Sequence, residues 1–147
     1  EGHTDSKPIN TKRFHSNWDL SAARSIALLE ILTTQFDAVH GLIHCSGGGQ
    51  TKCMKYLPGN MRIVKDDLFP TPIVFKLIQQ ASGADDREMY QVFNMGCRLE
   101  IYTSEAAAPE LIRIAEKWGV EARVIGRVES SDKKELVIKT ASGNLVY

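Results

Sequence analysis

Three consecutive glycines, Gly47 to Gly49, follow the apolar segment 39–44 (VHGLIH) after Cys45 and Ser46. A glycine loses more backbone entropy on folding than any other residue, so such a run is costly unless the backbone must approach another group closely or adopt a positive φ. The apolar segment predicts a buried strand, and a short helical turn is expected after the glycines, through Tyr56. The run therefore predicts a tight connection from a strand into a helical turn.

This connection is a candidate anion site. The amides of residues 47–50 can converge on a phosphate at the start of the helical turn, while Thr51 adds a hydroxyl and Lys52 a mobile positive charge. A flexible connector without a ligand is the alternative, but the strand before the glycines and the helix after them favour phosphate. Neither a Walker motif nor a dinucleotide-binding glycine motif is present. The predicted phosphate-binding residues are Ser46, Gly47, Gly48, Gly49 and Gln50.

Two further residues are candidates for catalysis. His44 ends the strand two residues before Ser46 and is either a hydrogen-bonded strand-end histidine or a proton donor beside the loop. Asn94 lies in a Phe-Asn-Met-Gly segment, where its amide can both donate and accept hydrogen bonds and Gly96 permits close backbone approach. An ordinary turn containing asparagine is the alternative for that segment.

No metal site is expected. His40 and His44 share one face of the predicted strand, but Cys45 faces the other way, and the spacing to Cys53 matches no common zinc pattern. The three cysteines form no C-x-x-C pair, so we expect free thiols and no disulfide.

The order of predicted elements favours an α+β fold, with a mixed sheet covered by helices, over a doubly wound nucleotide fold. Asp85 or Asp86 is expected to cap a helix, and Gly83 and Gly119 to end helices. We expect a flexible or partly ordered arm over 1–18 and a single domain over 19–147. The predicted helices are 20–36, 72–82, 87–92 and one beginning at Ser104; the predicted strands are 39–44, 61–64, one ending at Tyr102, 121–128 and a hairpin of 135–140 with 145–146.

The composition excludes several classes of function. The 147 residues carry 18 Lys and Arg against 18 Asp and Glu, and this balance argues against a nucleic-acid-binding tail or a polybasic membrane anchor. No apolar stretch approaches the roughly 20 residues that span a bilayer, and the N-terminus has no signal-peptide core. We therefore expect a cytoplasmic protein with neither a nucleic acid polymer nor a membrane as partner.

Four segments stand out in this order along the chain: His44–Gly49 (HCSGGG), Asp67–Ile78 (DLFPTPIVFKLI), Glu88–Gly96 (EMYQVFNMG) and Ile125–Val128 (IGRV). Together they resemble the C-terminal domain of the aminoimidazole ribonucleotide synthetase family, also called phosphoribosylformylglycinamidine cyclo-ligases. The resemblance covers about 39–128, and its most specific part is the segment from Glu88 to Gly96.

The resemblance implies an ATP-dependent ring closure in purine biosynthesis, which converts formylglycinamidine ribonucleotide to aminoimidazole ribonucleotide. ATP activates the amide oxygen, an internal nitrogen attacks and phosphate leaves, a reaction that needs positioning and electrostatic stabilisation. It also implies that an N-terminal domain, missing here, binds most of the ATP and Mg²⁺ and forms a homodimer. The triple glycine would face the phosphorylated ribonucleotide substrate, while His44 and Asn94 match family positions beside it.

Two departures from the family are visible. The N-terminal ATP-binding half is missing, and the motif that opens the family's C-terminal domain is not found in residues 1–38. We therefore expect an excised domain that is inactive alone. The alternatives are a domain of a sister enzyme, of the selenophosphate synthetase or thiamine monophosphate kinase type, and a stand-alone domain that binds a phosphorylated metabolite without catalysis.

Overall fold

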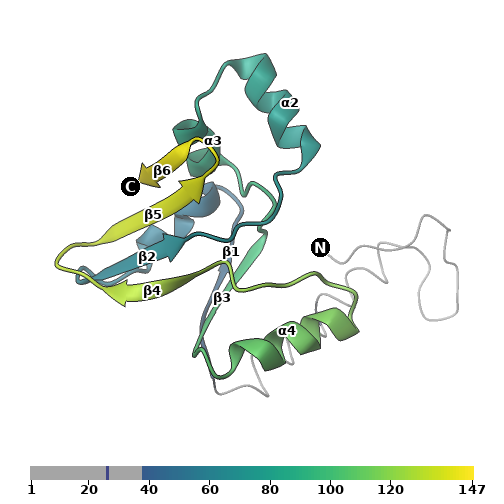
Figure 1. The fold of residues 1–147 in the computed structure, drawn as a ribbon, viewed down its shortest axis with the longest axis vertical. Coiled ribbons are helices and arrows are strands. Elements are labelled where there is room, and N and C mark those ends of the chain that lie inside the picture. The colour runs from purple at the N-terminus through teal and green to yellow at the C-terminus, as the bar shows by residue number, and fades with distance from the viewer. Residues whose placement is uncertain (1–25, 27–37) are drawn as a thin grey trace, which may run out of the picture. The chain divides into compact units, whose positions relative to one another are not determined.

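The computed structural model describes residue 26 and residues 38–147, shown in colour in Figure 1. The chain forms two compact units, which are described separately. The described residues of the first unit are 26, 38–41 and 102–123, and those of the second are 42–101 and 124–147.

A two-stranded sheet pairs β1 (Val39–His44) with β3 (Leu99–Thr103). Both strands lie where the sequence predicts them, because each is a mostly apolar run bounded by residues that favour turns. In the first unit Gly41 lies against the Tyr102 side chain. In the second, the amide of Cys45 donates to the carbonyl of Arg98 at 2.7 Å, so the pairing continues as far as the glycine loop that follows β1.

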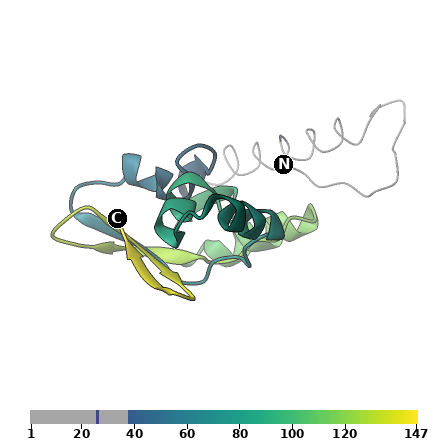
Figure 2. The same ribbon diagram turned by 90° about the horizontal axis from the view of Figure 1, so that it is seen from above.

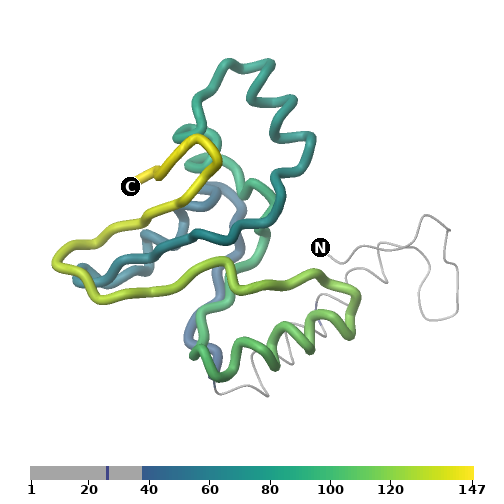
Figure 3. The backbone as a smooth tube through the Cα atoms, viewed as in Figure 1, coloured from purple at the N-terminus to yellow at the C-terminus, as the bar shows by residue number. Residues whose placement is uncertain are grey.

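The second unit is built on a four-stranded sheet, visible in Figure 1. Its middle strand β2 runs antiparallel to one neighbour, β4, and parallel to the other, β5, so the sheet is mixed, as predicted. β5 turns back directly into β6, which Figure 3 shows as a tight reversal of the chain. The strand order is β4 (Gly126–Ser130), β2 (Met61–Lys65), β5 (Glu135–Thr140) and β6 (Gly143–Val146).

Within the second unit, η1 (Gly49–Lys55) and α3 (Asp86–Val92) lie on one side of this sheet, as Figure 2 shows. The 3-10 helix η1 contacts both β5 and α3. Their contacts enclose an apolar core to which Ile63, Leu136 and Met89 contribute, each of them buried. The predicted α+β fold is confirmed.

The predicted helix ends are confirmed by their backbone geometry. Gly83 has a φ of 70° and ends α2 (Ile73–Ser82), while the Asp85 carboxylate accepts a hydrogen bond from the amide of Glu88 at 2.8 Å and caps α3. In the first unit Gly119 follows α4 (Ala108–Lys117), also with a φ of 70°. These positions need either a short oxygen acceptor or a positive φ, so their residues are readable from the sequence.

Two boundaries differ from the prediction by more than two residues. The helix expected from Ser104 begins at Ala108, because the Ser104 carbonyl accepts the amides of residues 107 and 108 in a turn that precedes the helix. The strand expected over 121–128 is confined to residues 126–130, the segment that pairs with β2. Regular β-structure depends on a neighbouring strand, and among the described residues 121–125 have none.

The expected arm over 1–18 and most of the expected helix over 20–36 lie outside the described residues. Ile26 alone is described there, and it is helical and exposed. Over the described part of the chain, no helix has the length and apolar character needed to cross a bilayer.

Candidate functional site

The segment Ser46–Gln50, here called the glycine loop, leaves β1 and enters η1. Gly48 has a φ of 91° and Gly49 a φ of 47°, both in the left-handed region that glycine adopts at low cost. The Gly49 amide donates to the carbonyl of Ser46 at 3.0 Å, so this nitrogen is engaged within the loop. The amide and the hydroxyl of Thr51 both donate to the Gly48 carbonyl at 3.0 Å.

Two amides of the loop remain available. Among the described residues, the nitrogens of Gly47 and Gly48 donate to no acceptor. Gly47 is exposed, and a Cβ added there would meet no atom within 4 Å. The exposed Ser46 hydroxyl accepts a hydrogen bond of 2.8 Å from the Lys52 ammonium. Two amides, a hydroxyl and a cation therefore lie together at the surface, a set of groups that suits an anion.

The glycine loop packs directly against the Asn94 turn, residues 93–96. A Cβ on Gly49 would lie 2.4 Å from the carbonyl oxygen of Phe93, so only glycine fits at this position. The Gln50 side chain donates from Nε2 to the carbonyl oxygen of Asn94 at 2.6 Å and to that of Cys97 at 3.5 Å. The structure thus brings together the two segments that the sequence singled out separately.

The Asn94 turn has an unusual backbone. Met95 has a φ of 51° and Gly96 a φ of 109°, and a Cβ at Gly96 would lie 3.0 Å from the ring of Pro72. Two successive positive φ values are sparsely populated and need support from the surroundings. The Asn94 side-chain oxygen supplies part of it by accepting the amide of Gly96 at 3.0 Å.

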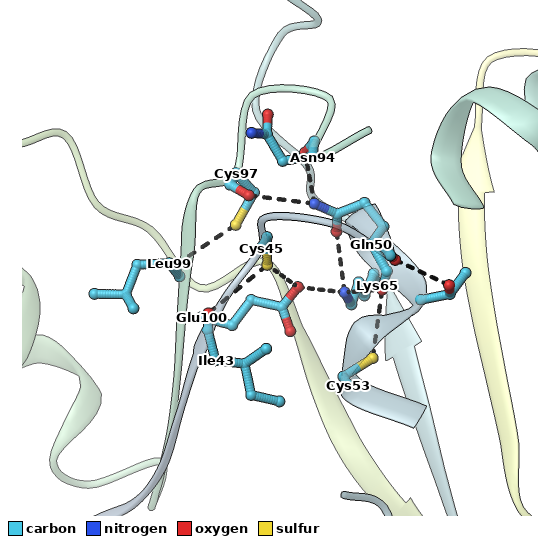
Figure 4. A network of polar contacts seen from close by, with 11 residues as sticks. Ile43, Cys45, Gln50, Cys53, Lys65, Asn94, Cys97, Leu99 and Glu100 are labelled. Carbon is cyan, nitrogen blue, oxygen red and sulfur yellow. Dashed lines mark hydrogen bonds and ion pairs between the residues drawn. The ribbon is translucent and has the colours of Figure 1, made fainter. Parts of the chain in front are cut away.

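A buried ion pair lies beneath the two segments, between Lys65 at the end of β2 and Glu100 in β3, as Figure 4 shows. Their side chains are 1% and 4% exposed. The Lys65 ammonium also donates to the carbonyl oxygen of Gln50 at 2.8 Å and to its Oε1 at 3.0 Å. Sequence reasoning missed this network; the available signal was two opposite charges, each set in an apolar strand.

The predicted site residues differ in exposure. His44 and Ser46 are exposed, and Gly47 and Gly48 offer free amides. Gln50 is completely buried, and its side chain binds protein groups instead of pointing out of the loop.

The three cysteines are buried free thiols, as expected. Cys45 points inward, with its sulfur 3.2 Å from Oε1 of Glu100, while the sulfur of Cys53 donates to the Gln50 carbonyl at 3.4 Å. A hydrogen bond with Cys97, burial and the negative charge of Glu100 all raise the pKa of Cys45, so its thiol stays protonated. No group of three potential metal-ligating side chains occurs among the residues that the structure describes.

Curated relatives of this chain include proteins named phosphoribosylformylglycinamidine cyclo-ligase. The phosphoribosylformylglycinamidine cyclo-ligase of Methanocaldococcus jannaschii is 37% identical to this chain over 105 residues. The match covers 71% of this chain and 29% of that protein. The protein of the same name from Pseudothermotoga lettingae is 27% identical over 121 residues, covering 81% of this chain and 36% of that protein. The chain thus spans about a third of the length of these curated relatives.

Solved structures share the fold. A crystal structure of the hydrogenase maturation protein HypE matches with a TM-score of 0.59 and 17% identity, over 82% of this chain and 40% of that one. HypE of E. coli matches with a TM-score of 0.56 and 20% identity, over 82% of this chain and 37% of that one. Residues 19–139 match the family model described as AIR synthase related protein, C-terminal domain, and the chain belongs to that family.

Proposed function

We propose that the protein containing this chain is a phosphoribosylformylglycinamidine cyclo-ligase, and that this chain is its substrate-side domain. The curated relatives carry that name, and the chain corresponds to about a third of each. The observation that carries the proposal is that the amides of Gly47 and Gly48, which donate to no acceptor among the described residues, lie beside the hydrogen-bonded Ser46 and Lys52. These groups would bind the phosphate of the ribonucleotide substrate.

In this proposal ATP and Mg²⁺ are bound mainly by a domain outside this chain. A solved HypE structure of the same fold is a complex with ATP, which supports ATP as the co-substrate. ATP supplies the phosphoryl group that turns the amide oxygen of formylglycinamidine ribonucleotide into a leaving group, and Mg²⁺ would neutralise its charge. The described residues hold no cluster suited to a metal, so we assign Mg²⁺ to none of them.

The residues of this chain bind and orient the substrate. The glycine loop holds the phosphate, so the ribose and the reacting amidine extend away from it. His44 is exposed at the end of β1, adjacent to the loop, and we propose that it moves a proton during ring closure. Asn94 shapes the turn against which the loop packs. The homodimer and the cytoplasmic location are also parts of this proposal.

The test compares two Gly→Val substitutions in the full-length protein. Gly47→Val places a side chain in open space at the mouth of the loop, and Gly59→Val does so in another exposed turn; a Cβ meets no atom within 4 Å at either site. Calorimetric titration with formylglycinamidine ribonucleotide should show affinity at least about tenfold weaker for Gly47→Val, because valine blocks both amides. Gly59→Val should bind like the wild type.

The outcomes separate the alternatives. Equal affinity for the two variants would remove the glycine loop from the site. Steady ADP release by the wild type that tracks aminoimidazole formation supports the cyclo-ligase, whereas binding of the nucleotide without ADP release supports a domain that binds a phosphorylated metabolite and does no catalysis.

A further inference from the structure

The network around Lys65 connects segments that are far apart in the sequence, and Figure 4 shows them converging. Lys65 ends β2, Glu100 lies in β3, and Gln50 is the second residue of η1. Through Gln50 the same network reaches the carbonyl oxygens of Asn94 and Cys97. One buried cluster therefore joins the glycine loop, the Asn94 turn and two strands.

The Lys65 ammonium uses its full hydrogen-bonding capacity. An ammonium group has three hydrogens and no acceptor. All three are committed, to the carbonyl oxygen of Gln50, to its Oε1 and to the carboxylate of Glu100. Since a lysine can only donate, the atom of the Gln50 amide that faces it must be the oxygen.

The contact between Lys65 and Oε1 of Gln50 also fixes the direction of the Gln50 Nε2 group. With Oε1 held by Lys65, Nε2 points at the carbonyl oxygen of Asn94, 2.6 Å away. Gln50 therefore acts as a spacer of set length between the end of β2 and the Asn94 turn. It also holds the glycine loop, because its own backbone carbonyl is bound by Lys65.

Apolar side chains of similar volume would fill this space without the desolvation free energy that buried charges cost. Burying an ion pair costs desolvation that is recovered only with good geometry and full hydrogen bonding. Here the hydrogen bonding is complete, since no buried side-chain nitrogen or oxygen among the described residues lacks a partner. Such a network contributes a defined geometry, whereas apolar side chains can repack.

We propose that Lys65 and Gln50 are positioning residues that set the spacing between the glycine loop and the Asn94 turn. The inference rests on the proposed function, in which the loop binds the substrate phosphate. Neither residue contacts substrate, because Lys65 is 1% exposed and Gln50 is 0% exposed. They act through the free amides of Gly47 and Gly48.

The first experiment needs no substrate. In the full-length protein, Gln50→Glu keeps the shape of the side chain but replaces the donor facing two carbonyl oxygens with an oxygen. Amide hydrogen exchange should become faster in peptides covering both 46–52 and 93–98, because their link is lost. The control Gln80→Glu makes the same chemical change at an exposed position on α2 and should leave both peptides unchanged.

The second experiment measures turnover well below the unfolding temperature of each variant. Gln50→Glu should raise the KM for formylglycinamidine ribonucleotide by about tenfold, with a smaller change in kcat, because misplaced amides weaken phosphate binding. A merely structural role would lower the melting temperature and leave the KM of the folded enzyme unchanged. Should Gln50→Glu not fold, Gln50→Met removes the link without adding charge and should show the same two effects.

The outcomes are decisive in each case. Unchanged exchange in the folded variant overturns the proposal, and so does a KM within twofold of the wild type. If the wild type itself releases no ADP, the proposed function fails, and the exchange rates alone decide whether Lys65 and Gln50 couple the two segments.

Discussion

Lys65 is a charged residue in the interior, and removing its charge should lower the stability of the folded protein. The carboxylate of Glu100 would stay buried without its cationic partner. We expect Lys65→Met to lower the free energy of unfolding by about 3–5 kcal/mol, the usual range when one partner of a buried pair is lost. Equilibrium denaturation followed by circular dichroism measures this.

The double variant Lys65→Met with Glu100→Leu provides the control. It removes both charges, so it should be more stable than Lys65→Met alone. A single variant that loses less than about 1 kcal/mol would show that the ion pair does not stabilise the folded protein.

For single residues, the sequence predicted the orientation of individual side chains better than it predicted which side chains contact one another. The outward His44, the inward Cys45 and the tight glycine run follow from strand alternation and from backbone sterics, which are local. Lys65 and Glu100 could not be paired, because they are 35 positions apart in the sequence and meet only after the strands fold. The predicted strand also ended at residue 64, which left Lys65 outside the core.

Among the elements, β2 and β4 approach closely at Gly126. A Cβ there would lie 2.0 Å from the carbonyl oxygen of Val64, which belongs to the backbone and cannot move aside. We expect Gly126→Ala to push the strands apart and to destabilise the protein by about 1–3 kcal/mol. Gly59→Ala, where a Cβ meets nothing within 4 Å, should be nearly neutral in the same thermal unfolding measurement. Equal melting temperatures for the two variants would refute the close approach.

Asp86 links three elements, because its carboxylate accepts hydrogen bonds from Ser142, in the β5–β6 turn, and from Gln79 of α2 at 2.8 Å. The bond from Ser142, followed by that from Gln79, lowers the pKa of Asp86 below its ordinary value. The unfolded chain therefore binds this proton more readily than the folded one. The stabilisation is complete above the ordinary pKa and is lost as the pH falls through the lowered one.

Thermal unfolding at a series of pH values tests this linkage. Between about pH 5 and pH 2 the wild type should lose more stability than Asp86→Asn, whose amide does not titrate. Parallel pH profiles for the two proteins would mean that the carboxylate is not held between the elements.

Elements were predictable where their ends carry a local signal. Gly83, Asp85 and Gly119 each fulfil a backbone requirement that only a few residue types satisfy. The strand prediction over 121–125 failed because alternation of apolar residues shows only that a strand is possible, and no strand of the described part of the chain pairs with this segment.

For the whole molecule, the chain covers about a third of its cyclo-ligase relatives. We therefore predict that these 147 residues, incubated alone with ATP and formylglycinamidine ribonucleotide, release no ADP. The full-length protein should release ADP in step with aminoimidazole formation in the same coupled assay. Turnover by the chain alone would place the ATP site within it. That result would overturn the proposal that ATP is bound mainly by a domain outside this chain.

The family could be predicted from four short segments in order, and the matching family model confirms it. The contact between two of those segments, the glycine loop and the Asn94 turn, could not be predicted, because it depends on how η1 and α3 pack. The order of the motifs along the chain is enough to identify the family. The distance between two motifs in space depends on how the core packs.

The open space around Gly47 makes this position suitable for a reporter group. All three native thiols are buried, so a cysteine introduced by Gly47→Cys would react first with a maleimide dye. Because the dye would lie over the same amides as the valine of Gly47→Val, labelling should weaken nucleotide binding, and a bound nucleotide should in turn slow the labelling reaction.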